Sequence, residues 1–265
     1  MKTTALNGTV LAWDESGTGP AVLLVHGLSE THASWRHQRD IFSQRFRVIA
    51  CDVRGFGESE IGEAAPRPEH YAHDLRALLV HLGVDRAAIV GFSMGGVIAQ
   101  CFAIHHPETT SALVIAASSS VVNRQAVEYF LERAKLADTQ GLEAVRATTV
   151  SDAAACFVAS SPEVVEAYRQ LRRGAIRDAQ GYHNACRAMA SLREQPLTQE
   201  LVNIRCQSLV ITGERDFLCP PKASEIIHAK IPNSRLRIAP GVGHCLHWED
   251  PAGFNGVVTD FLSSV

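Results

Sequence analysis

The chain has 265 residues, of which 46% are apolar and 20% charged, and this balance is typical of a globular domain rather than of a disordered or fibrous chain. The formal net charge is only −3. Lysine and arginine are scattered, which argues against a nucleic-acid partner, and the polar first residues and the lack of a long apolar run favour neither a secretory signal nor a membrane span. We therefore expect a cytoplasmic protein with no nucleic-acid or membrane partner, and its oligomeric state stays open.

Short apolar runs separated by helical segments dominate both ends of the chain. Asn7-Gly8 is a turn dipeptide that favours an opening hairpin at the edge of a sheet, with residues 9–13 as one strand. Buried strands are predicted at residues 21–25, 46–51, 87–90, 113–117, 208–212 and 236–239. Residues 71–82 carry leucines on one helical stripe and are followed by Gly83 as a stop, which predicts a helix.

This alternation predicts an α/β fold, in which a mostly parallel central sheet is covered by helices on both faces and ligands bind at the carboxyl ends of the strands. Strand-like runs disappear between about residues 119 and 196, where helical segments follow one another, and the alternation resumes at Leu201. We therefore expect a core of residues 1–118 and 197–265, interrupted by a helical cap, or lid, at 119–196 that lies over the carboxyl edge of the sheet.

The sequence Gly91-Phe92-Ser93-Met94-Gly95 places a GxSxG motif between a buried strand and a helix expected at residues 97–105. A nucleophile elbow needs small residues two positions before and after its serine, because the strained turn brings the backbone close to its neighbours. We predict that Ser93 is a catalytic nucleophile.

A serine nucleophile requires a histidine base and an acid that orients it. His244 follows the last predicted strand in a glycine-rich loop, and Asp216 follows the strand before it, in the chain order that GxSxG hydrolases use. His247 is the second choice of base, because it lies close to the following helix. Glu214 is the rival acid, although a residue beside the strand end more often serves the turn.

Two backbone amides are needed to stabilise the oxyanion of a tetrahedral intermediate. We expect one from Met94, at the start of the helix after the elbow, and the other from Leu28, in the loop His26-Gly27-Leu28-Ser29. His26 is interpreted as a structural, hydrogen-bonded group in preference to a general base.

No cofactor and no metal is predicted. The pairs His70 and His73, and His105 and His106, lack a third ligand nearby in sequence, and Gly91–Gly96 lacks the lysine of a phosphate-binding loop. The seven cysteines are widely spaced and form no CxxC pair, so we expect buried thiols without a disulfide framework. They are Cys51, Cys101, Cys156, Cys186, Cys206, Cys219 and Cys245.

Along nearly its whole length the chain resembles the α/β-hydrolase superfamily. The resemblance rests on His26-Gly27, on residues 52–59 (DVRGFGES), on the elbow, and on residues 213–216 (GERD) with Gly243-His244 and residues 249–251 (EDP). It implies the α/β-hydrolase fold, and a scaffold role for Asp52 and Arg54.

Within the superfamily the chain is similar to 3-oxoadipate enol-lactonases and to esterase-like relatives, through Gly181-Tyr182 and residues 185–188 (ACRA). Those lactonases usually carry Trp-Phe where this chain has Cys156-Phe157, so the substrate-binding residues and the substrate stay unknown.

The predicted reaction is acyl transfer on Ser93, in which an ester or lactone of a small molecule is hydrolysed, as in carboxylic ester hydrolases and lactonases. Two alternatives remain. One is another reaction on the same triad, either hydrolysis of a carbon–carbon bond or cofactor-free peroxidation, and the other is a receptor-like protein with slow turnover. Arg169, Arg172 and Arg173 share a helical face, with Arg177 nearby, and form either a solvated surface or a grip for a substrate carboxylate.

Overall fold

The computed structural model describes residues 1–62 and 67–265, and over these residues it is built on an eight-stranded sheet with the strand order β1-β2-β4-β3-β5-β6-β7-β8. The strands are β1 (Lys2–Leu6), β2 (Thr9–Ser16), β3 (Ala21–Val25), β4 (Arg47–Cys51), β5 (Ala87–Phe92), β6 (Thr110–Ala116), β7 (Gln207–Gly213) and β8 (Ser234–Ala239). β1 and β2 form an antiparallel hairpin at one edge, and β2 also pairs antiparallel with β4. The remaining neighbours are parallel, so the expected mostly parallel sheet with an edge hairpin is confirmed.

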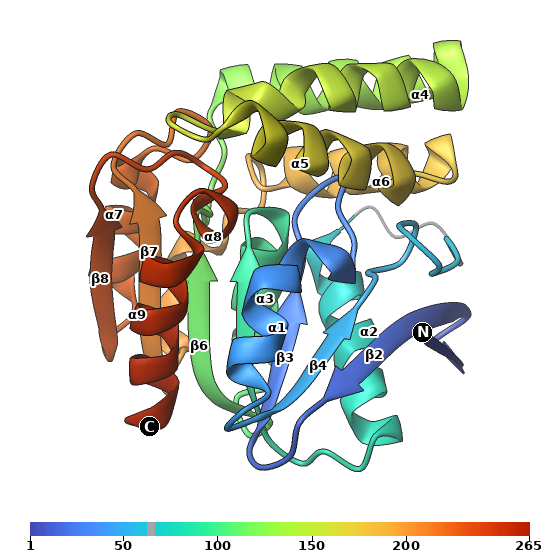
Figure 1. Ribbon diagram of the computed structural model, residues 1–265. Coiled ribbons are helices and arrows are strands. Elements are labelled where there is room, and N and C mark those ends of the chain that lie inside the picture. The colour runs from blue at the N-terminus through green and yellow to red at the C-terminus, as the bar shows by residue number, and fades with distance from the viewer. Residues whose placement is uncertain (63–66) are drawn as a thin grey trace.

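Helices cover both faces of this sheet (Figure 1). The α-helices are α1 (Arg36–Phe42), α2 (Pro68–His81), α3 (Met94–His105), α4 (Arg124–Asp152), α5 (Pro162–Ala175), α6 (Ala179–Ser191), α7 (Pro221–Lys230), α8 (Leu246–Glu249) and α9 (Pro251–Ser263). Short 3-10 helices occur at η1 (His32–Trp35), η2 (Ala153–Cys156) and η3 (Leu197–Asn203). Of the described helices, none is both long and apolar enough to cross a membrane.

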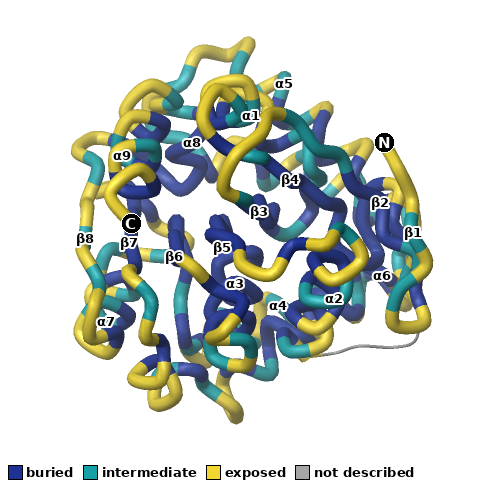
Figure 2. Tube along the Cα trace, turned by 90° about the horizontal axis from the view of Figure 1, so that it is seen from below, coloured by how far each residue is buried: buried dark blue, intermediate teal, exposed yellow. Residues whose placement is uncertain are grey.

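Alternate residues of each central strand pack into different cores. In β3, Leu23 and Val25 join a cluster that includes α2, α3 and α7, whereas Val22 and Leu24 join a cluster that includes α1, α8 and α9. A strand buried on both sides must be apolar at every position, which is why its sequence reads as a continuous run. Figure 2 shows β3, β4 and β5 mostly in the buried colour, while no residue of the edge strand β8 is buried.

Between β6 and β7 the chain forms α4, η2, α5 and α6, and residues 117–206, all of which are described, contain no strand. Figure 1 shows α4, α5 and α6 as a layer across the arrowheads of the parallel strands. We call α4–α6 the cap, and we propose that residues 119–196 form it as an insertion into the core. Gly141 has a φ of 73° and interrupts α4, which explains how so long a helix changes direction.

Candidate active site

Ser93 occupies the turn between β5 and α3 with φ 53° and ψ −117°, a conformation that costs energy for a residue other than glycine. A Cβ atom on Gly91 would lie 2.2 Å from the Gly95 carbonyl oxygen, and one on Gly95 would lie 2.1 Å from the Val25 carbonyl oxygen. Neither position therefore accepts a side chain without moving backbone. The elbow leaves Ser93 partly exposed between buried neighbours.

The helix after the elbow begins at Met94, so the expected start at residue 97 was wrong. Two glycines normally weaken a helix, which is why the sequence favoured a later start. Gly95 and Gly96 nevertheless lie in the helix, and close packing is the reason that both positions are glycine. A Cβ on Gly96 would lie 2.5 Å from the Ser118 Cβ. As a consequence Met94 stands in the first helical turn, where its amide has no carbonyl four residues earlier to bond.

The structure brings Ser93, His244 and Asp216 together from three different loops. The Nε2 atom of His244 lies 3.1 Å from the Ser93 Oγ, and its Nδ1 lies 2.8 Å from Oδ2 of Asp216. The second carboxylate oxygen of Asp216 accepts the amides of Leu218, at 2.9 Å, and Cys219, at 2.8 Å. The acid is therefore held in one orientation, with one oxygen left for the histidine.

The environment favours a basic His244. Burial alone would lower the pKa of this imidazole, because a charged ring is poorly solvated there. The negative charge and the hydrogen bond of Asp216 act against burial, and together with Cys156 and Glu30 they raise the pKa of His244 above its ordinary value. A raised pKa makes the neutral ring a stronger proton acceptor.

The two rival residues have other surroundings. The ring of His247 is fully buried, 4.3 Å from the ring of Phe92 and 5.0 Å from that of Trp35, and burial holds its pKa well below the usual value. Glu214 is exposed and accepts the Gly241 amide at 2.8 Å. Glu214 thus bridges the two loops that carry Asp216 and His244, in the turn-supporting role that its sequence position favours.

The loop after β3 places Leu28 and His26 differently. Leu28 is half-buried, and the loop packs against the elbow, since the Val25 and His26 carbonyls lie beside Gly95. The His26 ring lies 2.8 Å, through Nδ1, from the Gly27 carbonyl oxygen and accepts the Val53 amide on Nε2 at 3.0 Å. Both ring nitrogens therefore have hydrogen-bond partners, and burial lowers the pKa of His26, which favours the neutral ring.

Asp52 and Arg54 tie the following turn to the rest of the core. Asp52 accepts hydrogen bonds from the His32 amide, the His32 ring and the Glu58 amide. Arg54 forms a buried ion pair with Asp74. These contacts are internal to the scaffold, and they hold the turn in place.

The arginines of α5 do not share one environment, so the expected common face was wrong for Arg172. Arg169 pairs loosely with Glu166 at the surface, and Arg173 is exposed. Arg177 lies beyond the end of α5, where it is exposed and pairs with Glu58. Arg172 is 7% exposed and contacts the Cys156 Sγ at 3.6 Å. The reason is helical period: the inward stripe of α5 consists of Tyr168, Leu171, Arg172 and Ala175, spaced three and four residues apart.

Sequence reasoning missed Glu30 and Tyr168, which meet beside the predicted triad. Glu30 is completely buried, although it is an ionisable residue next to a polar loop. Its Oε1 accepts a hydrogen bond from the Tyr168 hydroxyl and its Oε2 accepts the Gly27 amide at 2.9 Å. The inward stripe of α5 was the available signal for Tyr168, but 138 residues separate it from Glu30.

Among the described residues no cluster of three or more histidine, cysteine or acidic side chains is arranged to hold a metal ion. Within the same residues the seven cysteines are free thiols, five of them buried. Cys156 differs from the others, because a hydrogen bond from Cys245 and the charge of Arg172 lower its pKa to about 7 against the effect of burial. Most of the cysteines thus serve as small buried side chains.

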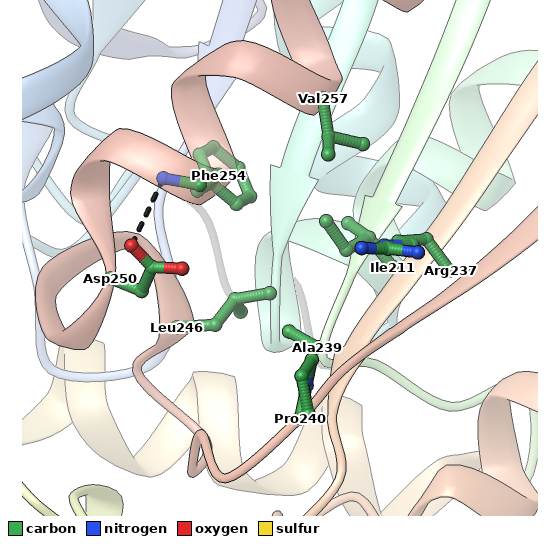
Figure 3. Close-up of a pocket in the computed structure, with 9 residues that line it drawn as sticks. Ile211, Arg237, Ala239, Pro240, Leu246, Asp250, Phe254 and Val257 are labelled. Atoms are coloured by element: carbon green, nitrogen blue, oxygen red, sulfur yellow. Dashed lines mark hydrogen bonds between the residues drawn. The ribbon is translucent and has the colours of Figure 1, made fainter.

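A crevice lies between β8 and α9 (Figure 3). Arg237 and Ala239 line one side, and Phe254 and Val257 the other. Its carboxylate, Asp250, accepts the Gly253 amide at 3.0 Å and so caps α9. The residues that line the crevice include none of the predicted triad, and its carboxylate serves the helix.

The model of a family described as "alpha/beta hydrolase fold" matches residues 20–251 of this chain. The curated 3-oxoadipate enol-lactonase 2 of Acinetobacter baylyi is 30% identical over 241 residues, which are 90% of this chain and 87% of that protein. A solved thermophilic esterase from Thermogutta terrifontis, with malate bound, is 30% identical with a TM-score of 0.86 and covers 99% of this chain and 96% of its own. The solved enol-lactonase from Burkholderia xenovorans LB400 is 26% identical with a TM-score of 0.89, covering 99% and 100%.

Proposed function

Because this chain belongs to the alpha/beta hydrolase fold family, we propose that it is a serine hydrolase that cleaves a carboxylic ester or lactone of a small molecule through an acyl-enzyme on Ser93. The observation that carries the proposal is the continuous hydrogen-bond chain from the Ser93 Oγ through His244 to Asp216. Similarity to an esterase and to enol-lactonases supports the choice of ester and lactone bonds.

In the first half of the reaction His244 accepts the Ser93 proton on Nε2 while Oγ attacks the substrate carbonyl carbon. The carbonyl oxygen becomes an oxyanion, which the amides of Met94 and Leu28 stabilise. His244 then donates its proton to the leaving oxygen, the carbon–oxygen bond breaks, and an acyl group remains on Ser93. In a lactone the leaving oxygen stays attached to the same acyl group.

In the second half a water molecule takes the place of the alcohol. His244 removes one of its protons, the hydroxide oxygen attacks the acyl carbon, and the same amides hold the second oxyanion. When His244 returns the proton to Ser93, the carboxylic acid leaves and the enzyme is restored. Asp216 supports both halves, because its hydrogen bond to Nδ1 keeps the lone pair of Nε2 directed at Ser93.

The proposal is tested by labelling with a fluorescent serine-directed phosphonate, followed by peptide mass spectrometry. We expect a single label on Ser93, and loss of both labelling and aryl-ester hydrolysis in Ser93→Ala, by on the order of a million-fold in turnover. Ser43→Ala, which changes a partly exposed serine at the C-terminal cap of α1, is the control and should keep wild-type labelling and turnover. Retention of more than a few per cent of the activity by Ser93→Ala would refute the mechanism.

The same assay separates the alternative functions. Rapid turnover of esters or lactones supports the hydrolase. Labelling of Ser93 with only a single turnover of every ester would instead favour a receptor-like protein. If the protein hydrolyses a vinylogous diketone, or catalyses peroxidation with hydrogen peroxide, and does not hydrolyse esters, then the same three residues carry out a different reaction from the one that we propose.

A further inference from the structure

Glu30 is a carboxylate with no exposed surface, in a loop that follows β3. A buried charge is costly unless its oxygens are hydrogen-bonded and a compensating charge is near. Both oxygens of Glu30 have partners, since Oε2 accepts the Gly27 amide at 2.9 Å and Oε1 accepts the Tyr168 hydroxyl. The compensating charge is Arg172, whose guanidinium is buried in the same region and whose pKa the charges of Tyr168, Cys156 and Glu30 raise against the effect of burial.

The bond to Gly27 closes a tight turn around Leu28. Gly27 and Glu30 flank Leu28 and Ser29, so the hydrogen bond joins the two ends of the segment that holds the Leu28 amide. Ser29 has a φ of 63°, in the left-handed region that a serine adopts only when its surroundings hold it there. Without the carboxylate this turn could relax, and the Leu28 amide would move with it.

The bond to Tyr168 reaches across to the cap. Tyr168 lies on α5, and its ring is fixed by edge-on contacts with Phe157 and Trp248, each with ring centres 5.2 Å apart. Phe157 belongs to the cap and Trp248 to the core, so the tyrosine is anchored on both sides. Its hydroxyl therefore holds the carboxylate from a rigid position.

From these contacts we infer that Glu30 is a positioning residue, which fixes the oxyanion-binding loop to cap helix α5 so that the cap completes the active site as well as covering it. This inference rests on the proposed function, because it assigns the Leu28 amide to the oxyanion. Glu30 does not itself reach the reacting atoms. Both of its oxygens are engaged by Gly27 and Tyr168, so it acts through the backbone that it holds.

The sharpest variant is Tyr168→Phe, which removes one hydroxyl and keeps the ring contacts. We expect kcat for an aryl ester to fall about tenfold to a hundredfold, with KM changed less than about threefold, because a small displacement of an oxyanion donor weakens the transition state more than the bound substrate. The matched control is Tyr129→Phe, which removes another cap hydroxyl that bonds a carboxylate, that of Asp152 at 3.2 Å. Its kcat should stay within about twofold of the wild type.

Substitutions of Glu30 test the other end of the contact. Glu30→Leu should lower kcat at least as much as Tyr168→Phe, and the double variant should be no worse than Glu30→Leu, because both changes break one linkage. Glu30→Gln keeps an acceptor for Gly27 and offers an amide to Tyr168, so it should recover most of the lost kcat. Since the Glu30 charge also raises the pKa of His244, Glu30→Gln should move the acid limb of kcat/KM to lower pH.

A readout independent of turnover keeps the inference separate from the proposed function. Hydrogen–deuterium exchange of the peptide that spans residues 26–31 should quicken in Tyr168→Phe and stay unchanged in Tyr129→Phe. Wild-type kcat together with wild-type exchange in Tyr168→Phe would overturn the inference while leaving the hydrolase intact. A rise in KM without a fall in kcat in Tyr168→Phe would also overturn the inference, because the Tyr168 hydroxyl would then contact the substrate. If the wild type neither labels at Ser93 nor hydrolyses esters, the proposed function fails, and the exchange result still decides whether Glu30 positions the loop.

Discussion

In the proposed mechanism the roles of His244 and Asp216 depend on their surroundings. Asp216 raises the pKa of His244 against the effect of burial, and only the neutral imidazole can accept the Ser93 proton. In the proposed mechanism, protonation of His244 therefore stops the reaction. The sign follows directly: activity is full above the raised pKa and is lost as the pH falls through it.

We accordingly expect kcat/KM to show an acid limb at a pH above about 6.5, the ordinary value for histidine. Asp216→Asn should move this limb to lower pH, because the stabilising negative charge is gone, and should lower kcat on the order of 10⁴-fold through the wrong tautomer. Glu214→Gln is the control, and its pH profile should match that of the wild type. If Glu214→Gln is the more damaging change, the acid has been assigned to the wrong residue.

The members of the predicted triad could be proposed from the sequence because each follows a recognisable strand, in the chain order that GxSxG hydrolases use. Glu30 could not be identified from the sequence, because its hydrogen-bond partner Tyr168 is 138 residues away in the chain and the two meet only in the folded protein. Arg172 was grouped with Arg169 and Arg173 for a related reason. Spacing alone does not say which side of a helix faces inward, and the apolar stripe of α5 had to be located first.

At the scale of elements, the strands were predicted well because a strand buried on both faces is apolar throughout. Their ends were less accurate. β6 begins at Thr110, three residues before the expected start, because a polar residue that still pairs in the sheet breaks the apolar run. The predicted start of α3 was also too late. Gly95 and Gly96 look like helix breakers in the sequence, although packing requires glycine at both positions.

The glycines of the elbow yield a stability prediction. Gly95→Ala should lower the free energy of unfolding by about 1–3 kcal/mol, because the added Cβ meets the Val25 carbonyl oxygen and backbone must shift. Gly256→Ala, in α9, is the matched control: nothing lies within 4 Å of its added Cβ, and the helix should gain about 0.5–1 kcal/mol. Urea denaturation measures both. Equal stability of the two variants would show that the elbow is less closely packed than the distances imply.

At the scale of the whole molecule, two carboxylates join the cap to the loops that carry the site. Glu30 links Tyr168 of α5 to the loop of Leu28. Glu249, at the end of α8, accepts both the Val158 amide of the cap and the Gly243 amide beside His244, each at 2.8 Å. Folding of the cap and assembly of the site are therefore coupled through hydrogen bonds as well as through apolar packing.

The buried side chain of Arg172 should contribute to the stability of the whole protein. Arg172→Met should destabilise the protein by about 1–3 kcal/mol, because it removes the hydrogen bond to the Cys156 Sγ and the positive charge that offsets the buried charge of Glu30. Arg173→Met, on the exposed side of the same helix, should change stability by less than about 0.5 kcal/mol. Denaturation followed by circular dichroism compares them. A stable Arg172→Met variant that loses only its preference for an acid-bearing lactone over the methyl ester would instead make Arg172 a substrate-binding residue.

We propose that acyl transfer proceeds through a covalent intermediate on Ser93, and trapping this intermediate would test the mechanism. The protein is mixed with a slowly hydrolysed aryl ester, quenched in acid within the first turnover, digested and examined by mass spectrometry. We predict that the acyl mass appears on the peptide containing Ser93, decays as product forms, and is absent from Ser93→Ala. Product formation at the full rate with no acylated peptide, or with the acyl group on another residue, would contradict the account.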